Sequence, residues 1–429
     1  MIRSFRMGMV VAVVALVSVT SAFLSPVAGA SPASAVNLTY IYNDLSILAT
    51  EHLAPSDGNI LGDVTDIVAY LNANGGLGGH QIHLTTYKMP SLTGSAATDH
   101  AACLAATEQD HAAIVLIGNA VGDDVGQCIT GQHGTVALAS DGPAVSIFQQ
   151  AHGRLFSSGS DESMDAQRLT EAMASVTSHD GYLTNKKIGV IVQGIPENQA
   201  EVSGTLVPTL KRLGHKVVAT ATVPYPTDAT NCSEVDPAIQ VMKQAGANVV
   251  FLAAYDLCAV SVVSAAKSDD YSPQWITDAD NTTATVSSFF APVKDEWNGA
   301  LGVTDTFPSS SGVPASAAQC VQKALVPKGL DYAVGSDAYG IATLNCIQLQ
   351  DIATAIKNAG ASPSEKSLVS ALEAEKAQPS NAGPSGSWGP DQHDSGNWVF
   401  LAKYSAAAGK MLPVGGKPVA VRIACPCAP

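Results

Sequence analysis

Residues 66–82 read DIVAYLNANGGLGGHQI, and this stretch decides the fold. Its first part places apolar residues at helical spacing, from Ile67 to Leu71. The glycines of the middle part, Gly75–Gly79, can adopt the positive φ that a helix end and a sharp return require. A strand begins at Gln81. The stretch therefore predicts a helix, a turn and a strand in succession, which is the repeating unit of an α/β protein.

The same alternation extends on both sides of this stretch. Strands are predicted at Val36–Tyr42, Gln81–Tyr87, Ala113–Gly118 and Thr135–Ala139. The helices between them are predicted at Asp63–Asn72, Ala96–Gln109 and Asp123–Thr130. Repeated βαβ units imply a parallel sheet that is covered by helices on both faces.

A second series begins near Phe156. Its buried-looking strands are Lys187–Gln193, Lys216–Val223 and Asn248–Ala253, and its helices are Met164–Thr177, Gln199–Leu213, Val235–Ala245 and Leu257–Ala266. After Ser272 the rhythm is irregular, with long helices at Val334–Asn358 and Ser364–Ala377 and a last strand at Asn397–Tyr404. Two such series predict an α/β protein with two doubly wound parallel-sheet lobes.

The first 35 residues have the pattern of a secretory signal peptide. Arg3 and Arg6 precede an apolar run, Met7–Val17, and A-x-A cleavage sites end at Ala30 and Ala35. No Cys precedes Cys103, so we expect no lipid anchor at a cleaved cysteine. We therefore expect an exported protein, periplasmic or extracellular.

The composition and net charge of the chain indicate which classes of partner it can bind. The formal net charge is −15, with 14% charged and 46% hydrophobic residues, which is typical of a folded chain that repels nucleic acid and anionic lipid surfaces. We expect a monomer that binds a small-molecule solute and no nucleic acid.

The eight cysteines are regularly spaced in the part that follows the signal. Cys103 and Cys128, Cys232 and Cys258, and Cys320 and Cys346 form three sequential pairs whose members lie 25 or 26 residues apart. An even number of cysteines in an exported chain favours disulfides, and we expect these three. Free buried thiols and other pairings remain the alternatives, and the pairing of Cys425 and Cys427 is left open.

In the order of its elements the chain resembles the branched-chain amino-acid-binding proteins, which are type I periplasmic binding proteins of ABC importers. The most specific segment is Asn72–Gly76, within the helix, turn and strand quoted above. The resemblance implies two lobes joined by three crossings. The first lobe would take residues 36–157 and 283–386, and the second would take residues 158–282 and 387–429. It also implies that an ABC-type permease is the partner.

The resemblance places the ligand at the carboxyl ends of the strands, where free N–H groups and helix N-termini lie. The candidate ligand-binding residues are Asn43, Asp44, Asn119 and Ser140 in the first lobe, and Asp161, Tyr255, Asp278 and Asp280 in the second. The family's amino-acid binders hold a carboxylate with Ser or Thr in the loop of Asn119, and this loop has neither. These residues predict a neutral polar or amine-bearing ligand. The alternative for each is a helix cap or a solvated loop residue.

No catalytic motif was found. The chain lacks G-x-S-x-G, H-E-x-x-H, a Walker-type Gly-Lys-Ser/Thr and C-x-x-C, so we expect no enzyme, no cofactor and no catalytic residue. His80 and His83 have no third ligand near them in sequence, so no metal site is predicted. The main alternative is an extracellular sensor or scavenger without a transporter, and a secreted hydrolase is a weaker one.

Overall fold

A computed structural model provides the structure of the chain. It describes residues 35–44, 46, 58–76, 79–90, 95–119, 121–140, 142–158, 167–224, 232, 234–254, 256–278, 291–304, 313–334, 336–375, 388–390, 392–394, 398–416 and 421–422. Within these residues, no helix has both the length and the apolar character needed to cross a membrane.

The first lobe is built on a five-stranded parallel sheet. Its strands, in spatial order, are β2 (Ile82–Lys88), β1 (Val36–Tyr42), β3 (Ile114–Ile117), β4 (Val136–Ala139) and β5 (Leu155–Ser157). The central strands β3 and β4 are buried at every residue. Continuous burial is expected of parallel strands with helices on both faces.

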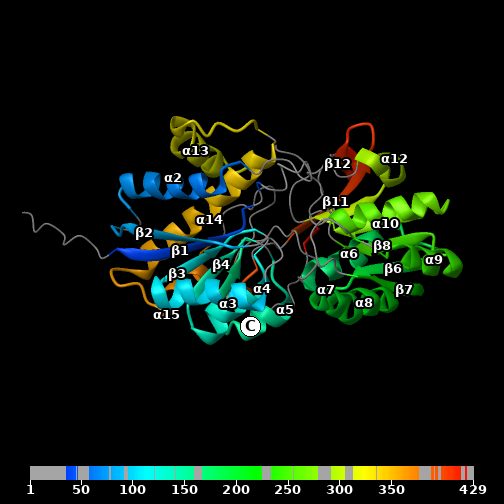
Figure 1. Ribbon diagram of the computed structural model, residues 1–429, viewed down its shortest axis with the longest axis horizontal. Coiled ribbons are helices and arrows are strands. Elements are labelled where there is room, and N and C mark those ends of the chain that lie inside the picture. Colours follow the sequence, from blue (N-terminus) through cyan, green and yellow to red (C-terminus); the bar gives the residue numbers. More distant parts are fainter. Residues whose placement is uncertain are drawn as a thin grey trace, which may run out of the picture.

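Helices from two distant parts of the sequence cover this sheet (Figure 1). One face packs against α2 (Ile60–Ala73), α13 (Ala315–Ala324), α14 (Asp337–Ala359) and α15 (Glu365–Ala374). The other face packs against α3 (Ala96–Leu104), α4 (Asp123–Gln127) and α5 (Val145–Gln150). π-helical turns at Ala105–Gln109 and Cys128–Gln132 extend α3 and α4.

The second lobe is built on a mixed sheet. Its strands, in spatial order, are β12 (Lys410–Pro413), β11 (Trp398–Ser405), β10 (Leu301–Thr304), β9 (Gln274–Asp278), β8 (Val249–Ala253), β6 (Ile188–Gln193) and β7 (Val217–Val223), and β13 (Val421–Arg422) pairs with β11. The strands from β10 to β7 are parallel, whereas β11 runs antiparallel to β10.

Helices cover both faces of the second sheet as well. One face packs against α6 (Gln167–His179) and a broken helix made of α7 (Pro196–Glu201), a π turn (Val202–Leu206) and α8 (Val207–Arg212). The other face packs against α9 (Asp236–Ala245), α10 (Asp256–Ser268) and α12 (Lys294–Trp297). The sequence predicted one helix at Gln199–Leu213. Pro208 lacks an N–H to donate within that segment, which accounts for the interrupted hydrogen-bond pattern.

Two expected lobe boundaries need correction. Strand β10 pairs with β9, so residues 291–304 belong with the second sheet although the first lobe was expected to resume at 283. Trp388 packs in the core of the first lobe, and Asp394 forms a bridge with Ser157 of β5, although residues 387–429 were expected in the second lobe. We therefore propose that the chain crosses between the lobes at 158–167, 304–313 and 394–398.

Candidate functional site

The carboxyl ends of the parallel strands define the candidate site. In both lobes these ends point toward the other lobe (Figure 1). The strand-end residues that follow β1, β3 and β4 therefore lie on the side of the first lobe that faces the second. Such ends carry backbone N–H groups without strand partners, and ligands of open α/β sheets bind there.

Asn43 and Asp44 directly follow β1. Asn43 is 3% exposed, so its amide is part of the interior. The Asp44 carboxylate contacts the Lys88 ammonium at the end of β2, with 2.5 Å between Oδ2 and Nζ, and it accepts the backbone N–H of Ser46. These hydrogen bonds, the one from Lys88 first, lower the pKa of Asp44 to about 2. Asp44 is therefore ionised at neutral pH and already has a cationic partner.

Ser140, which follows β4, belongs to a buried polar network. The Gln348 side chain of α14 donates from Nε2 to Ser140 Oγ at 3.0 Å and to Ser158 Oγ at 2.7 Å. Ser158 Oγ in turn donates to the carbonyl oxygen of Ala139 at 3.2 Å. Gln348 is fully buried and Ser140 is 2% exposed. The network fixes the end of β4 to Ser158, the residue that follows β5.

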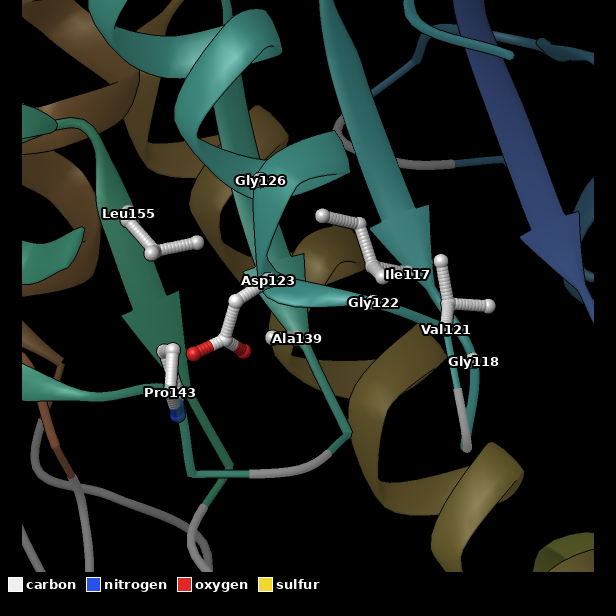
Figure 2. Close-up of a pocket in the computed structure, with 9 residues that line it drawn as sticks. All are labelled: Ile117, Gly118, Val121, Gly122, Asp123, Gly126, Ala139, Pro143 and Leu155. Atoms are coloured by element: carbon white, nitrogen blue, oxygen red, sulfur yellow. The ribbon is translucent and has the colours of Figure 1, made fainter. Parts of the chain in front are cut away.

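Asn119 follows β3 beside a small apolar hollow. The hollow is lined by residues from β3, β4, β5 and the start of α4 (Figure 2), namely Ile117, Gly118, Val121, Gly122, Asp123, Gly126, Ala139, Pro143 and Leu155. Its one acidic side chain is Asp123, whose Oδ2 accepts the backbone N–H of Ala144 at 3.0 Å. Asp123 thus fixes the loop after β4 to the start of α4.

The second lobe places other polar side chains at its strand ends. Gln193, the last residue of β6, is 1% exposed, and Asn198 in the adjoining α7 is also 1% exposed. Neither Nδ2 nor Oδ1 of Asn198 has a hydrogen-bond partner among the described residues. An unpaired buried amide is costly, so it marks a position where a further polar group is expected.

The structure brings some of the predicted residues together. Asn43, Asp44, Asn119 and Ser140 lie at the carboxyl edge of the first sheet, and Asp278 ends β9 at the corresponding edge of the second. Asp161, Tyr255 and Asp280 lie outside the described residues. Their contact with a ligand stays a prediction.

Sequence reasoning missed two residues at this site, Gln348 and Asn198. Gln348 is buried on α14 near two other buried polar residues, Asn345 and Asp351, so no local signal singled it out. Asn198 lies in α7, and its burial could not be read from the sequence.

The expected disulfides are confirmed. Cys103–Cys128, Cys232–Cys258 and Cys320–Cys346 are bonded, with Cα–Cα distances of 6.1, 5.0 and 6.0 Å. Two of them tie helices of the first lobe together, and the third lies in the core of the second. Of the two histidines considered for a metal, His80 has a backbone contact, with 3.0 Å between its Nε2 and the carbonyl oxygen of Gly360.

Comparisons with known proteins agree with this architecture. A family model described as periplasmic binding protein matches residues 64–409. An ABC-transporter solute-binding protein from R. palustris in complex with 4-hydroxybenzoate is similar in structure, with a TM-score of 0.67 and 15% identity over 91% of this chain and 97% of that one. A branched-chain amino acid ABC transporter protein from Thermus thermophilus with bound valine has a TM-score of 0.66 and 13% identity, over 90% and 96% of the two chains.

A third similar structure is the leucine-, isoleucine-, valine-, threonine- and alanine-binding protein from Brucella ovis in its closed conformation. Its TM-score is 0.64, with 15% identity over 90% of this chain and 94% of that one. No curated protein matches the chain. At these identities the likeness to solved structures concerns the fold.

Proposed function

Because the chain belongs to the periplasmic binding protein family, we propose that it is an exported solute-binding protein that closes around a small polar or amine-bearing molecule and delivers it to an ABC-type importer. The observation that carries this proposal is the pair of sheets whose parallel strands have carboxyl ends that point toward each other. The secretory pattern of residues 1–35 and the three disulfides support export, since disulfides persist in oxidising compartments.

Closure follows from the division of the site between the lobes. A ligand that touches the first lobe alone gains half of its contacts, and the other half become available when the second lobe approaches. Such a ligand binds the closed form more tightly than the open form and shifts the population toward it. The crossings at 158–167, 304–313 and 394–398 are the hinges of this motion in our proposal.

The ligand class follows from how the first lobe uses its polar groups. The hydroxyl of Ser140 is already bonded to Gln348, and the described residues of the loop after β3 offer the amide of Asn119 and no hydroxyl. A ligand carboxylate therefore meets few hydroxyl donors here, and Asp44 adds negative charge. An ammonium or a neutral polar group is compatible with both features.

Native mass spectrometry of freshly purified protein, followed by calorimetric titration, tests the ligand class. The titration compares leucine, valine and 4-hydroxybenzoate with amines and polyols, and we expect the carboxylates to bind at least tenfold more weakly than the best neutral or amine-bearing compound. Micromolar binding of leucine or 4-hydroxybenzoate would contradict the ligand class while leaving the binding function intact.

Small-angle scattering tests the closure itself. We expect the radius of gyration to fall when the best ligand of the titration is added at saturation. An unchanged radius with a saturating ligand would contradict the closing mechanism.

Asp161→Ala and Tyr255→Ala are expected to weaken binding with the far-UV circular dichroism unchanged.

A further inference from the structure

The Cys103–Cys128 disulfide differs from the other two in its neighbours. Cys103, Cys128 and His133 each place a ligand atom within 4.8 Å of those of the other two, and no other group of three metal-binding side chains occurs among the described residues. A second imidazole is close as well, because His100 Nδ1 lies 3.8 Å from Cys128 Sγ. Two cysteines and two histidines therefore meet at one place on the first lobe.

The local backbone explains why these four side chains converge. His100 and Cys103 lie three residues apart on α3 and so share a helix face. Cys128 is the first residue of a π-helical turn, and His133 follows that turn, with its N–H bonded to the carbonyl oxygen of Cys128 at 3.1 Å. A π turn brings residues five apart into register. Such turns occur frequently at functional sites.

The 3.8 Å between His100 Nδ1 and Cys128 Sγ matches the ligand spacing of a tetrahedral zinc site, whereas the disulfide bond holds the two sulfurs closer together. With Zn–S of about 2.3 Å and Zn–N of about 2.0–2.1 Å, neighbouring ligand atoms lie roughly 3.3–3.8 Å apart. Opening the disulfide separates the two sulfurs toward this spacing, and small side-chain rotations bring the imidazoles into place. Glu108 supports the assignment, because its Oε1 lies 3.9 Å from His133 Nδ1 and leaves Nε2 for a metal. A carboxylate on the far ring nitrogen is the usual outer partner of a metal-binding histidine.

The cysteines are more buried than the histidines, which leaves one side of the cluster open to a metal ion from solvent. Cys103 is fully buried and Cys128 is 4% exposed, whereas the side chain of His133 is 23% exposed and His100 is exposed. The histidines form the outer side of the cluster, and the sulfurs form its floor. An ion arriving from solvent meets the imidazoles first.

We propose that Cys103, Cys128, His133 and His100 form a redox-gated zinc site that replaces the disulfide when the two cysteines are reduced. A dithiol reductant transfers two electrons and two protons to the disulfide, so that the S–S bond breaks, two thiols form and the reductant becomes a disulfide. Zinc then binds both sulfurs as thiolates and displaces the two thiol protons to solvent. Two neutral imidazoles complete the tetrahedral set.

The test uses the full chain carrying Cys425→Ser and Cys427→Ser, which removes the two cysteines outside the three disulfides. The protein is reduced with a phosphine and titrated with Co²⁺, whose absorption reports thiolate ligation, and then with Zn²⁺ against a chromogenic chelator. We expect one equivalent of metal in the reduced protein and none in the oxidised protein. His133→Ala and Glu108→Gln should each weaken Zn²⁺ binding about tenfold or more.

Matched variants identify the site. Cys103→Ser with Cys128→Ser should abolish the thiolate–Co²⁺ absorption, whereas Cys320→Ser with Cys346→Ser and the exposed His179→Ala should leave it unchanged. The proposal is overturned if the reduced parent protein binds no metal. It is equally overturned if His133→Ala binds as tightly as the parent, or if the signal survives loss of Cys103 and Cys128. Far-UV circular dichroism of each reduced variant checks that the fold matches that of the reduced parent.

Discussion

The carboxyl edges of the two sheets differ in how their polar side chains are satisfied. At the first edge Asp44 is paired with Lys88, and Gln348 joins Ser140 to Ser158. At the second edge the buried amide of Asn198 has no partner among the described residues. The polar side chains named at the first edge therefore already have partners within the protein. We expect a ligand to form its hydrogen bonds mainly with side chains at the second edge.

The largest expected effect comes from removing the centre of the first edge. Gln348→Ala leaves the hydroxyls of Ser140 and Ser158 buried without their amide partner, so the free energy of unfolding should fall by about 2–3 kcal/mol. Gln350→Ala, on the same helix and partly exposed, should change it by less than about 0.5 kcal/mol. Urea unfolding measures both. Equal effects would show that the first edge is not held together by this network.

Two buried acids of the first lobe should make its stability depend on pH. Burial raises the pKa of Glu375 to about 8, and it raises the pKa of Asp351 on α14 as well. A carboxyl whose pKa is higher in the folded than in the unfolded state contributes stability that is full below about pH 4.5 and is lost as the pH rises toward 8.

Glu375→Gln stays neutral across this range and tests the effect. Relative to the parent, the variant should gain about 1–2 kcal/mol of unfolding free energy between pH 5 and pH 8.5. Urea unfolding at pH 5, 7 and 8.5 checks this. The exposed Glu234→Gln serves as the control and should show a constant difference from the parent. A Glu375→Gln difference that does not grow with pH would mean that the carboxyl is ionised in the folded protein.

The second edge is tested by Asn198→Ala. If the Asn198 amide meets the ligand, the substitution should weaken binding about tenfold, which is about 1.4 kcal/mol, without destabilising the unliganded protein. Gln199→Ala, the exposed neighbour in α7, should leave the affinity within about twofold. Calorimetry and thermal unfolding separate the two readouts. Lower stability with unchanged affinity would assign Asn198 to the core instead.

The smallest effect is expected for Asp44→Asn. The Asp44 carboxylate and the Lys88 ammonium are both partly exposed, with side chains 38% and 55% accessible, so their pairing should contribute no more than about 0.5 kcal/mol at neutral pH. Since the pKa of Asp44 is lowered to about 2, this contribution is present above about pH 4 and is lost as the pH falls toward 2. Unfolding at pH 7 and pH 3 measures it. A loss above 1 kcal/mol at pH 7 would mark Asp44 as structural.

The sequence predicted most strands to within one residue, β8 and β11 of the second sheet included, and missed several short ones. Val36–Tyr42 was predicted with its observed bounds, because all of its residues but Asn37 are apolar, aromatic or β-branched. Strands β9 and β10 were missed. Their place in the second sheet is set by pairing with each other and with β8, residues that lie apart in the sequence.

The site was predicted in part for a similar reason. Asn43, Asp44, Asn119 and Ser140 were predicted to lie at one edge because each follows a predicted strand, and parallel strands end on the same side of a sheet. Gln348 was not found, because its partners lie 208 and 190 residues away along the chain. No local pattern reports a contact of that separation.

The sequence by itself determined the two α/β series, the export pattern and the regular spacing of the six cysteines, because each depends on neighbours or on spacing along the chain. The tertiary structure alone decided that β10 joins the second sheet, that Ser140 is engaged by Gln348, and that two histidines flank one disulfide. Those outcomes depend on contacts that form only when the sheets and helices pack, because packing joins residues that lie far apart in the sequence.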